Sequence, residues 1–307
     1  MKKISQPADS ILGHLKRLKH YIDKTTIGDL KADWYTLCVK ASLAKCYEFN
    51  VAIRTRDQPS LAFFWAPALR GICEELIVLK FADKLPKDDR QNLIQLLMTH
   101  DVYSRIKSQD KFFSATRPQQ PVLRVRDAET ILGQTEAKIR KIWNSHGWPN
   151  LKYGTMPQIR QLAERQDQSV LATLYDYLYR FTSGTVHFSV QSLFRSGWGD
   201  SPECCKFSTT HFEPYFSAFA LVYGAFLFCV YFESFGRTLR PNKKVVKIVS
   251  EIRKEIILEP RWPEMLTFEE MNLKPPDDSP ILRLLLSAVQ ARETKSLLKL
   301  GESKPKV

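Results

Sequence analysis

Four residues whose side chains can handle a phosphate group lie close together in the second half of the chain. Tyr179, Ser183 and His187 are spaced four residues apart, and Arg180 stands seven residues before His187. The surrounding apolar pattern predicts a helix, and residues four or seven apart on a helix project from nearly the same face. We therefore expect a cation, hydroxyl groups and an imidazole to converge on one stripe of this helix.

This set of side chains suits phosphate chemistry at neutral pH. The imidazole of His187 can accept a proton near pH 7. The guanidinium of Arg180 can grip two phosphate oxygens and stabilise developing negative charge. The alternative is that His187 and Tyr179 only satisfy hydrogen bonds inside a helical core, and the residues alone leave both interpretations open.

A second candidate pair, Arg70 and Glu74, lies four residues apart in an earlier apolar segment. This spacing allows an ion pair along one helix face. A buried pair of this kind is costly unless it is fully hydrogen-bonded, so it needs a structural or functional reason. Two interpretations follow. The pair is an internal brace that joins two helices, or it faces His187, where Glu74 would fix the tautomer of the imidazole and raise its basicity.

The elements that position these residues are predicted to be almost entirely helical. Glycine is scarce, with 12 residues in 307, which counts against a hairpin-rich β-sandwich or barrel. The predicted fold class is all-α, a multi-helix bundle with a short irregular or minor strand insert near residues 196–210. Apolar spacing predicts helices over residues 10–24, 33–56, 60–83, 88–108, 126–144, 156–166, 169–194, 211–239, 242–257 and 281–300.

Local signals refine these boundaries. Asp9 or Ser10 is expected to cap the first helix and Asp88 the fourth, because their side-chain oxygens can accept from free backbone N–H groups. Pro67 is expected either to kink the third helix or to mark its first turn.

The chain divides by charge and proline content into three regions. Residues 1–31 form a basic N-terminal helix region, residues 32–240 a helical bundle, and residues 241–307 a basic C-terminal helix with a proline-rich tail.

The segment 214–232 contains 19 residues without a charge, which is the lower limit for a membrane-spanning helix. Eight of these residues are aromatic, and Pro214 and Gly224 interrupt the pattern. A helix at the centre of a bundle is apolar on all sides for the same reason. We expect a buried core or dimer-interface helix, with a membrane span as the alternative.

The formal net charge is +13, and it is unevenly distributed. Residues 1–31 carry a net charge of +4, whereas residues 104–141 and 237–262 each carry +5. Basic surfaces of this kind suit RNA, DNA or anionic lipid as a partner, and the alternative is an ordinary solvated surface.

Several classes of protein are not supported. The chain lacks the glycine-rich motifs of P-loop and dinucleotide-binding proteins and the Gly-x-Ser-x-Gly motif of serine hydrolases. It has no CxxC pair, so neither a metal site nor a cofactor is predicted. Cys38, Cys46, Cys73 and Cys229 lie in apolar helical patterns, where free cysteine acts as a small hydrophobe. The N-terminus has no apolar signal core, so we expect a soluble, cytoplasmic protein.

The spacing Arg180-x6-His187 resembles the Arg-x(4–6)-His motif of HEPN (higher eukaryotes and prokaryotes nucleotide-binding) domains. The wider pattern, with Arg70, Glu74 and Tyr175, also resembles an uncharacterised bacterial family of helical proteins, and covers about residues 35–235. HEPN domains are helical bundles, often dimeric, and many are metal-independent ribonucleases. The resemblance implies that His187 is the general base on a 2′-hydroxyl and Arg180 the phosphate ligand. Phe181 departs from the motif, because active members usually carry a polar residue there.

These observations lead to two principal functional hypotheses. The first is a HEPN-like, metal-independent RNA endonuclease or toxin effector in bacterial anti-phage defence, with Tyr179 and Ser183 completing the site. The second is a non-catalytic helical binding or regulatory module that uses the same polar residues. A membrane-associated role is a third alternative. The expected partners are RNA or another nucleic acid, a second copy of the chain, and a protein partner such as an antitoxin.

Overall fold

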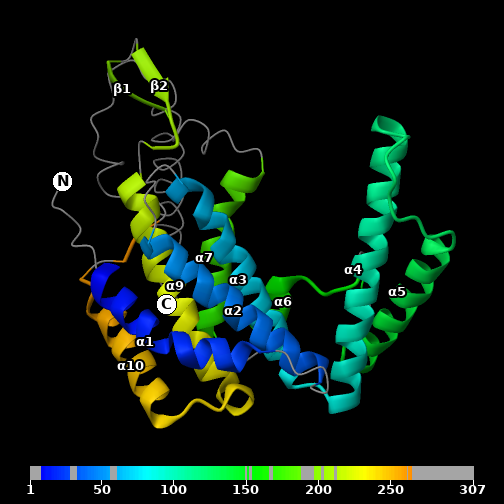
Figure 1. The fold of residues 1–307 in the computed structure, drawn as a ribbon, viewed down its shortest axis with the longest axis horizontal. Helices are drawn as coiled ribbons and strands as arrows, with labels where there is room; N and C mark the ends of the chain where they lie inside the picture. The colour runs from blue at the N-terminus through cyan, green and yellow to red at the C-terminus, as the bar shows by residue number, and fades with distance from the viewer. Residues whose placement is uncertain are drawn as a thin grey trace, which may run out of the picture.

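The predicted all-α bundle is confirmed. A computed structural model describes residues 8–27, 33–55, 61–148, 151, 154–165, 169–187, 197–201, 204–210, 213–260 and 262–264. These residues form nine α-helices and one pair of short antiparallel strands (Figure 1).

The elements follow one another in the order predicted by the apolar spacing. The helices and strands are α1 (Ala8–Thr26), α2 (Trp34–Thr55), α3 (Ala62–Asp83), α4 (Lys87–Thr116), α5 (Ala128–Ser145), α6 (Ile159–Glu164), α7 (Ser169–Val186), β1 (Gly197–Ser201), β2 (Cys204–Phe207), α9 (Glu213–Leu239) and α10 (Lys243–Leu258). The helix predicted over residues 281–300 lies outside the described residues, as do residues 188–194 of the helix predicted over 169–194.

The predicted helix caps are wrong. Helix α1 begins one residue before Asp9, so Asp9 and Ser10 lie within its first turn. The residue before α4 is Pro86, and Asp88 lies inside the first turn, where its charge favours the positive end of the helix dipole. Pro67 lies inside α3, which continues on both sides of it.

Helix α4 extends eight residues beyond its predicted end at residue 108. The apolar periodicity fades there, which is why the sequence indicates an end. The start of α5 lies beside Lys107, whose Nζ is 2.6 Å from Oε1 of Glu129, so the last eight residues of α4 extend past α5. The loop between the two helices contacts this part of α4, where Nε of Arg124 donates to Oδ1 of Asp110 at 2.5 Å.

Helix α9 forms the centre of the bundle and packs against α2, α3 and α10 (Figure 1). Its buried side chains point in all directions around the axis, as Phe219, Ala225, Leu227 and Phe228 show. Among the described helices, only α9 is long and apolar enough to cross a membrane, and 83% of its apolar window is buried inside the protein. The structure thus gives α9 the buried environment that a central bundle helix requires.

The basic helices α1 and α10 pack against each other and against the bundle. Ile11, Leu15 and Leu18 of α1 are buried in the same core as Ile248 and Ile252 of α10. The lysines of both helices consequently project outward, away from this core.

Helices α4 and α5 pair with each other and extend to one side of the bundle (Figure 1). Of the 30 residues of α4, only Leu93 is buried. Trp143 of α5 is buried and packs on Phe81 of α3, which ties the base of this pair to the bundle.

The strands β1 and β2 form a short antiparallel pair, with Trp198 opposite Lys206 and Ser201 opposite Cys204. A register shift separates these two pairs. The pair follows α7 in the chain and precedes α9, which is the place predicted for a minor strand insert.

The close crossing of α2 and α9 at Gly224 leads to a stability prediction. A Cβ at this position would lie 2.9 Å from Cε1 of Phe49 and 3.1 Å from Oδ1 of Asn50. Overpacking of this kind costs about 1–3 kcal/mol, which exceeds the gain of about 1 kcal/mol in helix propensity. We expect Gly224→Ala to lower the free energy of unfolding, measured by chemical denaturation.

The matched control is Gly13→Ala in α1, where nothing lies within 4 Å of the added Cβ. This substitution should raise the free energy of unfolding by about 0.5–1 kcal/mol. A Gly224→Ala protein as stable as the Gly13→Ala protein would contradict the crowding argument.

Candidate functional site

Helices α3 and α7 pack against each other through the residues singled out in the sequence. The guanidinium carbon of Arg70 lies 4.4 Å from the ring centroid of Tyr179. One turn away, the hydroxyl of Tyr175 donates a hydrogen bond of 3.2 Å to Oε1 of Glu74. Because the residue order on α7 is reversed relative to α3, the two helices run antiparallel at this contact.

Arg70 and Glu74 form the predicted ion pair along α3. Nε of Arg70 donates to Oε1 of Glu74 at 2.8 Å, and the side chains are 23% and 29% exposed. Burial lowers the pKa of Arg70, but the hydrogen bond and charge of Glu74 outweigh it, and the net pKa is raised. Burial, reinforced by the charge of Glu74, raises the pKa of Tyr175 to about 12, so its hydroxyl stays a donor at neutral pH.

These four residues, Arg70, Glu74, Tyr175 and Tyr179, form a connected cluster that we call the α3–α7 brace. It contains an ion pair, a hydrogen bond and a cation–π contact, and the two tyrosine rings lie 5.9 Å apart. These contacts agree with the interpretation of the Arg70–Glu74 pair as an internal brace between helices.

The alternative, in which Glu74 faces His187, does not agree with the structure. His187 directly follows α7 and lies twelve residues beyond Tyr175, which corresponds to about 18 Å along the helix axis. Its side chain is exposed, and no hydrogen bond between described residues joins it to Glu74. The antiparallel packing explains why Glu74 and His187 are far apart. Along α7 the chain runs from Tyr175 toward His187, and the residues of α3 on that side come before Arg70, whereas Glu74 comes after it.

Arg180 and His187 lie on the solvent side of α7. The side chain of Arg180 is 63% exposed, and its Nε donates to Oδ2 of Asp176 at 2.9 Å. Seven residues separate Arg180 from His187, so the two lie within about 20° of each other around the helix and about 10 Å apart along it. We call Asp176, Arg180 and His187 the α7 outer row.

Asp176 was not identified as a candidate from the sequence. Its spacing could have indicated it, because a carboxylate four residues before an arginine on a helix forms an ion pair. It supplies the counter-charge of Arg180 and lies on the same face of the helix.

Ser183 lies between Tyr179 of the α3–α7 brace and the α7 outer row. At 100° per residue, Ser183 is about 60° from Arg180 around the helix, and Tyr179 is about 100° away. Ser183 is half-buried, whereas Tyr179 is 38% exposed. The predicted site residues of α7 therefore form one continuous surface from the brace to the outer row, and His187 marks its far end.

Phe181 holds α7 in this orientation. Its ring stacks on Phe219 of the central helix with centroids 3.7 Å apart and planes inclined by 15°. Leu178, one turn earlier, is fully buried. Phe181, the residue that departs from the HEPN motif, is thus a core residue, because its side chain points inward while that of Arg180 points outward.

No group of three or more His, Cys, Asp or Glu side chains in the described part of the chain could hold a metal ion. Cys46, Cys73 and Cys229 are buried and free, and Cys38 is partly buried. Burial raises the pKa of Cys73 and of Cys229 to about 12, which keeps these thiols protonated and unreactive at neutral pH.

Comparison with known proteins gives a family match for part of the chain. Residues 66–203 match the model of a family of unknown function (DUF5677). The matched range contains both the α3–α7 brace and the α7 outer row, and the match carries no HEPN assignment. No curated protein and no solved structure matches the chain.

The contacts of the α3–α7 brace predict the effect of removing its carboxylate. Glu74→Ala deprives both the Arg70 guanidinium and the Tyr175 hydroxyl of their acceptor, so we expect the free energy of unfolding to fall by about 1–3 kcal/mol. The double variant Arg70→Met, Glu74→Leu removes the unpaired cation as well and should recover most of this loss. Denaturant titration measures both effects.

The matched control is Glu164→Ala on α6. Glu164 pairs with Arg160 at the same four-residue spacing and 2.8 Å, but both side chains are more than half exposed. The stability change should therefore stay within about 0.5 kcal/mol. An equal loss in the two Glu→Ala proteins would show that the brace does not stabilise the contact between α3 and α7.

The raised pKa of Tyr175 predicts a dependence of stability on alkaline pH. Because the folded pKa of about 12 lies above the ordinary tyrosine pKa of 10.0, the stabilising contribution is complete below about pH 10 and is lost as the pH rises toward 12. One such tyrosine contributes a slope of at most about −1.4 kcal/mol per pH unit. Tyr175→Phe should make the fall in unfolding free energy between pH 10 and 12 less steep, whereas an unchanged slope would contradict this assignment.

Proposed function

We propose that this protein is a HEPN-like, metal-independent endoribonuclease that acts on RNA as a toxin effector in bacterial anti-phage defence. The observation that supports this most directly is the α7 outer row, in which Arg180 on α7 and His187 directly after the helix are both exposed. An enzyme that acts on a polymer needs both side chains accessible. Buried side chains satisfied by the core would have favoured a structural role instead.

Arg180 is available to a phosphate because its present partner is held weakly. The Arg180–Asp176 pair is a surface ion pair, with side chains 63% and 40% exposed, and such pairs contribute about 0–1 kcal/mol. A phosphodiester can therefore replace Asp176 and accept two parallel N–H bonds from the guanidinium. The long side chain of Arg180 can then swing from Asp176 toward Ser183 on the next turn and His187 one turn beyond it.

The proposed reaction is an internal transesterification of RNA. The neutral imidazole of His187 takes the proton from the 2′-hydroxyl, and the 2′-oxygen forms a bond to phosphorus. The bond from phosphorus to the 5′-oxygen breaks, and that oxygen takes a proton from solvent. Arg180 stabilises the charge on the phosphate oxygens, with a hydrogen bond from the hydroxyl of Ser183, while Tyr179 borders the site.

The second candidate function is a non-catalytic binding or regulatory module. The core position of Phe181 favours it, because the polar residue that active HEPN members carry there is absent. In this case Arg180 and His187 would bind a ligand without turnover. For both functions we expect a cytoplasmic protein that forms a homodimer or binds a protein partner such as an antitoxin.

Cleavage of a labelled single-stranded RNA tests the proposal. His187→Ala should lower the cleavage rate by about 10²–10⁴-fold, because it removes the general base. Arg180→Ala should lower it as well, and Arg180→Lys should restore little because lysine lacks the planar fork. EDTA should leave the rate unchanged. Asp176→Asn should retain or raise activity, because it frees the guanidinium.

Two control variants remove the same side chains elsewhere. Arg105→Ala on α4 removes an exposed arginine that also pairs with a carboxylate four residues away. His20→Ala on α1 removes another exposed histidine. Both should cleave at the wild-type rate. Full activity in a folded His187→Ala protein would overturn the catalytic assignment, whereas RNA binding without cleavage by the wild type would favour the binding module.

A further inference from the structure

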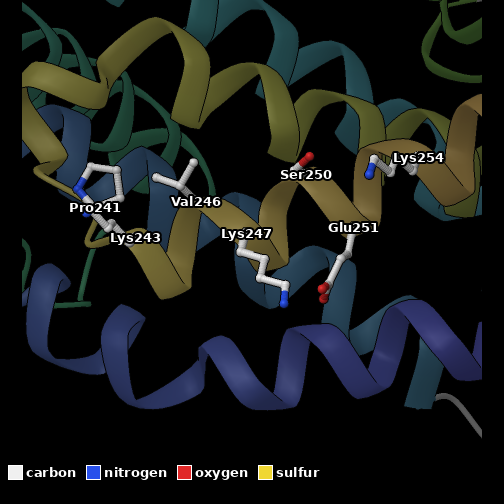
Figure 2. Close-up of a pocket in the computed structure, with 7 residues that line it drawn as sticks. All are labelled: Pro241, Lys243, Val246, Lys247, Ser250, Glu251 and Lys254. Atoms are coloured by element: carbon white, nitrogen blue, oxygen red, sulfur yellow. The ribbon is translucent and has the colours of Figure 1, made fainter.

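Helix α10 has two faces of opposite character. Its inner face is buried in the core through Val245, Ile248, Val249, Ile252 and Ile256. Its outer face presents three exposed lysines, Lys243, Lys247 and Lys254, with Ser250 between the last two (Figure 2). We call this surface the α10 lysine face.

The α10 lysine face is hollowed. The hollow has a volume of about 440 Å³ and is lined by Pro241, Lys243, Val246, Lys247, Ser250, Glu251 and Lys254. Figure 2 shows the side chains of Lys247 and Glu251 extending from α10 on the side where α1 runs. A hollow of this size accommodates a group as large as a nucleotide.

The net charge of this hollow is positive because three lysines and one carboxylate line it, and that carboxylate is already paired. Oε2 of Glu251 lies 3.4 Å from Nη1 of Arg17 and 3.4 Å from Nδ1 of His14, both on α1. None of the three lysines has a carboxylate partner among the described residues. At 1.5 Å per residue, they are spaced about 6 Å and about 10 Å along the axis.

We propose that the α10 lysine face binds the phosphate backbone of a nucleic-acid strand. Lysine ammonium groups act as point charges toward phosphate, so the binding would be independent of sequence. Val246, Ile257 and Leu258 of α10 are exposed, but the continuous apolar face of the helix is the buried one, whereas a helix that lies in a membrane directs that face outward. This inference concerns a surface on α10 and does not depend on cleavage at the α7 outer row.

The experiment measures binding of a labelled single-stranded RNA by fluorescence anisotropy, in a His187→Ala background that keeps the probe intact. The triple variant Lys243→Gln, Lys247→Gln, Lys254→Gln should bind at least about tenfold more weakly at low salt. Since each lost phosphate contact lowers the salt dependence by about 0.7, the slope of log K against log salt should decrease by about two. The altered lysines are exposed, so the variant should keep its fold, as circular dichroism can check.

The matched control removes the same charge from the other basic segment. Lys111→Gln, Lys138→Gln, Lys141→Gln changes three exposed lysines of α4 and α5. Its affinity should fall by less than about threefold, because net charge acts weakly at a distance in salt. An equal loss in the two triple variants would overturn the assignment to α10.

A third variant predicts a gain rather than a loss. Glu251→Gln removes the carboxylate of the hollow and frees Arg17, so RNA binding should become several-fold tighter. Damage to the fold would not produce tighter binding. Unchanged or weaker affinity in a folded Glu251→Gln protein would count against the proposal.

Vesicles containing phosphatidylserine provide the test against a membrane partner. The wild type should bind RNA in preference to these vesicles. Binding to the vesicles that depends on the three lysines, with no measurable binding to RNA, would overturn the proposal. Lysine-dependent RNA binding without any cleavage by the wild type would support this inference while contradicting the proposed nuclease function.

Discussion

Burial of α9 on all sides is the constraint on which the rest of the structure depends. A helix that is apolar around its whole circumference is shielded from solvent only if other helices surround it. The helices α2, α3 and α10 meet this requirement. The crossing with α2 is so close that the side chain of Asn50 donates to the backbone oxygen of Gly224 at 2.9 Å. The positions of the outer helices, and therefore of the charges they carry, follow from this central packing.

The orientation of α7 connects this packing to the candidate site. Phe181 stacks on Phe219 of α9, and Tyr175 and Tyr179 contact Glu74 and Arg70 of α3. These attachments fix two sides of α7 and leave its third side in solvent. The exposure of the α7 outer row is thus a consequence of how the buried sides are held rather than an independent feature.

The sequence predicts most of this fold because helical periodicity and the apolar α9 segment carry strong local information. The end of α4 could not be predicted, since the helix continues after the apolar pattern fades, in a part contacted by the loop that follows it. The helix caps failed because one residue decides a cap, and tertiary contacts move helix ends by that amount. The position of Glu74 relative to His187 depends on the antiparallel arrangement of α3 and α7, which the spacing within each helix does not contain.

The two clusters on α7 differ in how easily their partners can be exchanged, and this difference bears on function. In the α3–α7 brace, Glu74 accepts from both Arg70 and Tyr175 in a half-buried setting, so removing one member leaves another polar group without its partner. In the α7 outer row, Arg180 pairs with the exposed Asp176, and water can satisfy either group when they part. A ligand phosphate competes easily in the second setting and poorly in the first. The side chains that hold α7 in place are therefore unsuited to binding a substrate, and the weakly paired ones beside them are suited to it.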